Sequence, residues 1–77
     1  GIENMTLEEF AKLAGVSVFK CDPDWGGSIG YKCLDYPNSR VCGFRSEAAA
    51  YKSWLEDTFG TNTSKAVLTL LKQTKTV

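Results

Sequence analysis

Apolar residues at helical spacing mark the first predicted element. They recur at intervals of three and four, at Leu7, Phe10, Ala11 and Ala14. Thr6 and Glu9 occupy the two positions of a capping box, in which side chain and backbone bond reciprocally. Gly15 suits the left-handed residue that ends many helices. The pattern predicts a helix over residues 6–14.

Three stretches of β-chemistry follow, over residues 16–21, 28–36 and 39–45. The turn between the first two is rich in Asp, Gly and Pro, and Pro37 with Asn38 is the expected tip of the second hairpin. That tip predicts a register with chemically matched partners. The pairs are Asp35 with Arg40, Leu34 with Val41, Cys33 with Cys42, and Tyr31 with Phe44.

Two further helices are predicted after the strands. Ser46 is the expected N-cap of the first, Gly60 ends it, and its apolar stripe is Ala48, Tyr51, Leu55 and Phe59, with Trp54 at the edge. The last helix is expected to present Val67, Leu70, Leu71 and Thr74 as its apolar face. The order is α-β-β-β-α-α, an α+β fold in which a helix packs on a three-stranded antiparallel sheet.

Composition narrows the class of protein. The chain has 77 residues, which suit a single domain over residues 2–77. Nine basic and nine acidic residues give zero net charge, which argues against a strongly cationic nucleic-acid coat. There is no His, no glycine-rich phosphate loop and no metal-ligand spacing. We therefore expect a protein that is not an enzyme, with no catalytic residues, no metal and no cofactor.

Strand alternation divides the side chains between two faces of the sheet. The face expected under the second helix carries Phe19, Cys21, Tyr31, Cys33, Cys42 and Phe44. Its three cysteines have three interpretations. They are small buried hydrophobes, or Cys33 and Cys42 form a cross-strand disulfide under oxidation, or one is a reactive thiol. The odd cysteine count, with no secretion signal, favours a reducing cytoplasm.

The opposite face is the candidate binding surface. Its residues are Val18, Lys20, Lys32, Leu34, Val41 and Arg45. An aliphatic centre of Val18, Leu34 and Val41 is surrounded by three cations. Either a helix covers this centre, or the face is open and binds a partner, because an exposed aliphatic patch on a small domain indicates an interaction site.

The segment from Gly30 to Phe59 resembles a known type of DNA-binding domain. Gly43-Phe44-Arg45-Ser46-Glu47 ends the strands, and small residues from Ala48 open a helix. This is similar to the sheet-plus-helix domains of the phage integrase arm-binding and AP2 type. The resemblance implies that an exposed sheet face enters the DNA major groove. Its implied contact residues are Lys20, Lys32, Arg45 and, in the turn, Trp25.

Two functions follow as hypotheses. The first is a small cytoplasmic interaction protein, encoded by a phage or mobile element, that inhibits or redirects a regulator or a host enzyme. The alternative is a DNA-binding accessory domain. A protein partner is expected in the first case and DNA in the second. A homo-oligomer is compatible with both. No apolar run in the sequence is long enough to span a membrane.

Overall fold

The computed structural model describes residues 4–71, except for the side chains of Trp25 and of residues 36–39. Its elements follow the predicted order, with one added turn of 3₁₀ helix. They are α1 (Leu7–Leu13), β1 (Val16–Lys20), η2 (Pro23–Trp25), β2 (Ile29–Cys33), β3 (Tyr36–Phe44), α2 (Glu47–Phe59) and α3 (Thr61–Leu70). The predicted α+β fold is confirmed.

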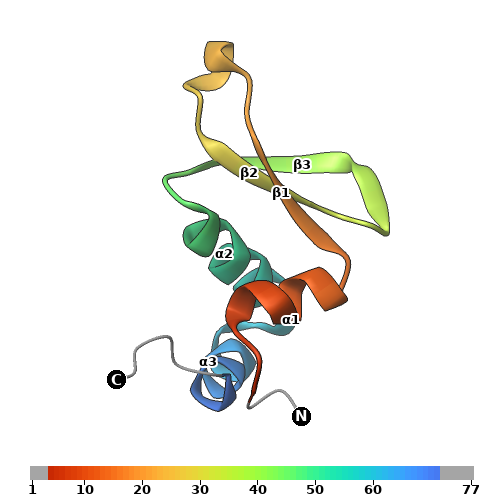
Figure 1. Ribbon diagram of the computed structural model, residues 1–77, viewed down its shortest axis with the longest axis vertical. Helices are drawn as coiled ribbons and strands as arrows, with labels where there is room; N and C mark the ends of the chain where they lie inside the picture. The colour runs from red at the N-terminus through yellow and green to blue at the C-terminus, as the bar shows by residue number, and fades with distance from the viewer. Residues whose placement is uncertain (1–3, 72–77) are drawn as a thin grey trace.

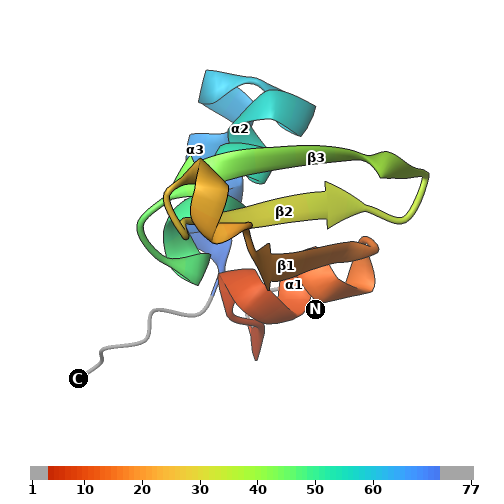
Figure 2. The same cartoon turned by 90° about the horizontal axis from the view of Figure 1, so that it is seen from above.

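The fold has a sheet layer and a helix layer. The antiparallel sheet has the order β1-β2-β3, and the three α-helices lie on one side of it (Figure 1 and Figure 2). α2 contacts all three strands, α1 contacts β1 and α2, and α3 packs on α2. No α-helix within residues 4–71 covers the other side of the sheet, which we call the open face; only the short helix η2 lies over one end of it (Figure 2).

Local caps set the helix boundaries. At α1, the Glu9 amide donates to Thr6 Oγ1 at 3.2 Å, and the Thr6 amide donates to Glu9 Oε1 at 2.9 Å, so the predicted capping box is confirmed. At α2, Ser46 Oγ accepts the Ala49 amide at 3.2 Å. Gly60, at φ +84°, joins α2 to α3, which begins without a side-chain cap. Thr74, predicted in the last helix, lies outside the described residues.

The core lies between α2 and the sheet. Its buried cluster contains Ala11, Val16, Tyr31, Ala50, Tyr51, Trp54 and Leu55. The predicted stripe of α2 is therefore partly wrong, because Ala48 is exposed and Phe59 is 41% exposed, whereas Ala50 and Trp54 are buried. The helix is rotated about its axis relative to the prediction, which places the larger Trp54 ring inside.

The predicted register of the second hairpin is wrong. Cys33 pairs with Tyr36, so the turn is Leu34-Asp35 and Pro37 lies within β3. β3 is an edge strand, where a proline without an amide hydrogen is tolerated. The Leu34 amide donates to the Gly15 carbonyl at 2.8 Å, which ties this turn to the start of β1.

The face assignment along β1 is also reversed. Val18 pairs with Tyr31 and packs against the core, so it is not on the open face as predicted. Alternation then places Phe19, Cys21 and Lys32 on the open face. Val41 pairs with Tyr31 and is 39% exposed, while Phe44 packs against the core. The predicted aliphatic centre is consequently not a single surface.

Candidate binding site on the open face

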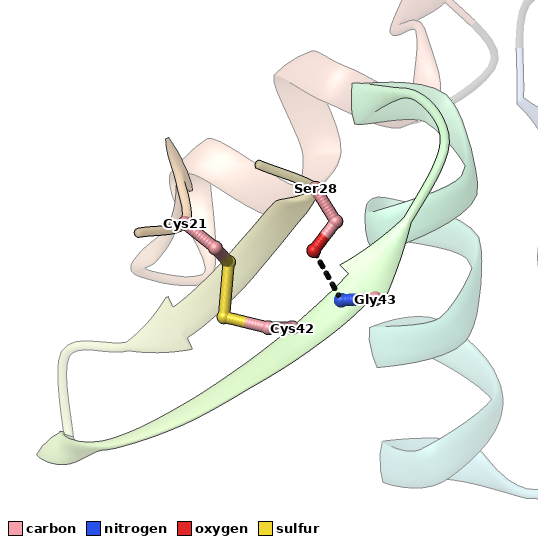
Figure 3. Close-up of a disulfide and its surroundings, with 4 residues drawn as sticks. All are labelled: Cys21, Ser28, Cys42 and Gly43. Carbon is pink, nitrogen blue, oxygen red and sulfur yellow. Dashed lines mark hydrogen bonds between the residues drawn. A yellow bond between two sulfur atoms is a disulfide. The ribbon is translucent and has the colours of Figure 1, made fainter. Parts of the chain in front are cut away.

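A disulfide crosses the open face. Cys21, directly after β1, is bonded to Cys42 in β3, and their Cα atoms are 6.3 Å apart (Figure 3). Cys33 is the free cysteine, half-buried against the core on the helix side. The prediction that the cysteines are buried hydrophobes is wrong for this pair, and so is the predicted Cys33–Cys42 pairing. Because disulfides persist in oxidising environments, the cysteine argument for a reducing compartment no longer holds.

Gly30 makes room for this disulfide. It lies in β2, the central strand, between the two edge strands that carry the cysteines. A Cβ atom at this position would lie 2.5 Å from the Val41 carbonyl oxygen, 2.8 Å from Cys21 Sγ and 3.0 Å from Cys42 Sγ. Only glycine therefore allows the sulfur atoms to cross the central strand so closely.

A β-bulge at Gly43 places the Cys42 side chain on the open face, where it is bonded to Cys21. Ile29 pairs with Phe44 and Gly30 pairs with Cys42, so Gly43 is an extra residue in the ladder. Its φ of +112° is one that glycine adopts readily. Its amide donates to Ser28 Oγ at 3.0 Å instead of to the ladder (Figure 3). The bulge lets Cys42 and Phe44, two positions apart, occupy opposite faces of the sheet.

A groove of about 560 Å³ runs beside the disulfide. It is lined by Phe19, Lys20, Cys21, Asp22, Arg40 and Cys42. The Arg40 guanidinium carbon lies 5.5 Å from the centre of the Phe19 ring, a cation–π contact that orients the guanidinium group. The sequence pattern did not indicate Phe19 or Arg40 as site residues, because strand alternation predicted Phe19 in the core and the predicted register paired Arg40 with Asp35.

A second hollow brings two of the predicted residues together. Lys20 and Arg45 both line a hollow of about 480 Å³. Its lining also includes Gly26, Gly27, Ser28 and the bulge residue Gly43. Trp25, also predicted, ends η2, and its side chain is outside the described set. Leu34 lies in the β2–β3 turn and is 76% exposed. Of the predicted cations, alternation therefore places Lys32 on the open face and Lys20 at the end of β1 on the helix side, and the predicted aliphatic residues are dispersed.

Charge is divided between the two layers. The charged residues within the strands are Lys20, Lys32 and Arg40, all cations, and Arg45 follows β3. The acids of the helices are Glu8, Glu9, Glu47, Glu56 and Asp57, and their cations are Lys12, Lys52 and Lys65. The sheet also has acids near it, but they lie in turns, at Asp22, Asp24 and Asp35. The zero net charge of the chain therefore includes a net positive charge on the strands and a net negative charge on the α-helices.

Among the described residues, the titratable group with a strongly shifted pKa lies on the other side of the sheet. Burial, together with a 3.1 Å hydrogen bond donated to Asp57 Oδ2, raises the pKa of Tyr31 to about 12. This tyrosine stays protonated at neutral pH and acts as a hydrogen-bond donor in the core. Among residues 4–71, no three His, Cys, Asp or Glu side chains come together as ligands for a metal ion.

Comparison with known proteins assigns no relative. No protein-family model, curated protein or solved structure matches the chain. Within the described part of the chain, none of the helices has both the length and the apolar character needed to cross a bilayer.

Proposed function

We propose that the protein is a small DNA-binding domain that contacts duplex DNA with its open face. The observation that carries this proposal is the charge of the strands, whose charged residues are all cations, on a sheet that has one side without an α-helix. An antiparallel β-ribbon fits the major groove, where arginine and lysine contact phosphates and guanine edges. The acidic helix layer would then point away from the DNA, which favours one orientation of approach.

The individual side chains suit this role in different ways. Arg40 is held against Phe19, and its planar guanidinium group can donate two parallel hydrogen bonds. Lys32, on the open face, and Lys20, at the end of β1, carry compact ammonium charges of the kind that contact phosphates. Val18 packs against the core and not on the open face, so the open face lacks one of the three aliphatic residues that an apolar protein interface there would need. The resemblance to the integrase arm-binding type points in the same direction.

The test is binding of a fluorescein-labelled DNA duplex, measured by fluorescence anisotropy across a range of salt concentrations. Each phosphate contact contributes about 0.9 to the slope of log affinity against log salt, so three cations predict a slope of about −3. Lys32→Ala and Arg40→Ala should weaken binding and make the slope shallower. Lys65→Ala, in α3, is the matched control and should do neither. Equal effects of Lys32→Ala and Lys65→Ala would refute the open face as the interface.

An apolar surface at the end of the sheet supports a second candidate, a protein partner. Leu13 is 74% exposed and Leu34 is 76% exposed. Leu34 lies against Gly15, two residues beyond Leu13, so the two leucines are at the same end of the molecule. A regulator or enzyme bound here would fit the interaction-protein hypothesis. Leu34→Asp should then abolish capture of that partner and leave DNA binding unchanged, whereas Arg40→Ala should have the opposite effect.

A further inference from the structure

We propose that the Cys21–Cys42 disulfide is a thiol–disulfide exchange site that controls the shape of the open face. The inference about affinity rests on the proposed DNA-binding function, whereas the inference about exchange chemistry does not. The reactant is a thiol reductant, and the reacting atom is Cys42 Sγ. Three features of the structure support the proposal. They are the exposure of Cys42, the cations beside the disulfide, and the position of the disulfide on the open face.

Access distinguishes the two sulfurs. Cys42 is exposed, whereas Cys21 is 4% exposed, and both line the groove on the open face. An incoming thiolate therefore reaches Cys42 first. Structural disulfides that are closed off from solvent lack such an approach, so this disulfide has the exposure of a labile one.

Charge favours the exchange step. The attacking thiolate forms a bond with Cys42 Sγ, the bond between the two cysteines breaks, and Cys21 leaves as a thiolate that takes up a proton. A second thiol of the reductant then attacks the mixed disulfide, which releases Cys42 as a thiol and oxidises the reductant to its own disulfide. Lys20 and Arg40 line the same groove and stabilise the thiolates at each stage, although Asp22 lies there as well.

Position connects this chemistry to binding. Cys21 lies two residues from Phe19, and Cys42 lies two residues from Arg40, so the disulfide fixes the two edge segments that hold the Arg40–Phe19 contact of the open face. Both sulfurs lie directly over Gly30, where there is no room for a Cβ atom. Two unbonded sulfur atoms need more separation than two bonded ones. Reduction therefore frees the two side chains to rotate away from each other and removes the covalent link between the two edges of the sheet on this face.

The regiochemistry is tested with glutathione, a thiol that traps the first step. The oxidised protein is incubated with reduced glutathione under native conditions, quenched with acid and mapped by mass spectrometry. Glutathione is expected on Cys42, with Cys21 as a free thiol. Modification mainly on Cys21, or no exchange until denaturant is added, would overturn the exchange site. This readout is independent of DNA.

The consequence for binding is tested with the oxidised and the dithiothreitol-reduced protein. Reduction should weaken duplex binding at least fivefold and shift amide NMR resonances on the open face, with those of α2 unchanged. The double variant Cys21→Ser/Cys42→Ser should match the reduced protein in both conditions. Cys33→Ser is the control and should behave as the wild type.

The remaining outcomes each decide a different point. Unchanged affinity with the disulfide demonstrably broken would overturn the control of binding. A reduced protein without dispersed amide resonances would overturn it too, because the disulfide would then be a structural crosslink of the fold. Failure of both redox forms to bind DNA, with glutathione trapped on Cys42, would refute the DNA-binding proposal and leave the exchange site standing.

Discussion

Gly30→Ala is expected to destabilise the protein through three contacts made by one added methyl group. The Val41 oxygen at 2.5 Å belongs to the backbone, and the sulfurs at 2.8 and 3.0 Å are held by their bond. None of the three can move away as a free side chain would. Inserting a methyl group into a well-packed site costs about 1–3 kcal/mol, and this site should lie at the upper end of that range. A domain of this size derives only about 3–5 kcal/mol from its core, so the loss is severe.

Urea denaturation followed by tryptophan fluorescence measures this effect. With a dependence of about 1 kcal/mol per molar urea, the midpoint should fall by about 2–3 M. Ser17→Thr, which adds a methyl group to an exposed residue of β1, is the control and should stay within about 0.5 kcal/mol of the wild type. The penalty at Gly30 should also shrink in dithiothreitol, because the freed sulfurs can move aside. A loss below about 1 kcal/mol with the disulfide intact would refute the steric argument.

Three other predictions test the core, the tyrosine and the cysteines. Leu55→Ala, at a fully buried position, should cost about 2–5 kcal/mol in urea denaturation, whereas Leu70→Ala, at a half-exposed one, should cost about 0.5 kcal/mol or less; equal losses would contradict the packing. Because the pKa of Tyr31 is raised from 10.0 to about 12, the unfolded chain loses this proton first. The free energy of unfolding should therefore fall as pH rises through that interval, less steeply in Tyr31→Phe, and equal slopes would disprove the assignment. Alkylation of the denatured, unreduced protein should modify Cys33 alone, and reduction of the disulfide, whose cysteines are 21 residues apart, should lower stability by about 3 kcal/mol.

Short-range signals in the sequence predicted the elements correctly. The capping box at Thr6, the N-cap at Ser46 and the glycine at position 60 each act within a few residues, and each is confirmed. The order of helices and strands, and hence the α+β class, follows from these local rules and from the alternation of apolar residues. Local sequence is sufficient where the stabilising hydrogen bonds are themselves local.

The faces of the sheet could not be obtained in the same way. The predicted register assumed a turn at Pro37 and unbroken alternation, whereas the turn lies at Leu34-Asp35 and Gly43 is an extra residue, so Cys42 and Phe44, predicted on one face, lie on opposite faces. Chemically matched pairs do not identify the correct register, since several registers of a short hairpin offer sensible partners. The disulfide depends on both the register and the bulge, so an error in either one removes it. Among the residues of the open face, the sequence therefore indicated Lys32 and missed Phe19 and Arg40.

The bulge itself provides a test of this account. In the ladder, Phe44 pairs with Ile29 and Cys42 pairs with Gly30, and Gly43 has no partner between them. Removal of Gly43 would therefore leave the ladder regular at this point, with both pairs in place, although a second register shift remains between Tyr31 and Cys33. The deletion loses the exposed hydrogen bond to Ser28, worth about 1 kcal/mol, and removes a glycine whose ordering costs about 0.5–1 kcal/mol. These two contributions nearly cancel.

Deletion of Gly43 should accordingly yield a folded protein with an intact disulfide and a free energy of unfolding within about 1 kcal/mol of the wild type. The control is deletion of Ser17, which is also small and exposed but lies within a regular ladder. That deletion turns Val16, which is 3% exposed, away from the core, and should cost about 2 kcal/mol or more. Urea denaturation and a count of free thiols measure both variants. If the Gly43 deletion loses the disulfide or is as unstable as the Ser17 deletion, then Gly43 is not an extra residue, and the bulge does not explain why Cys42 and Phe44 occupy opposite faces.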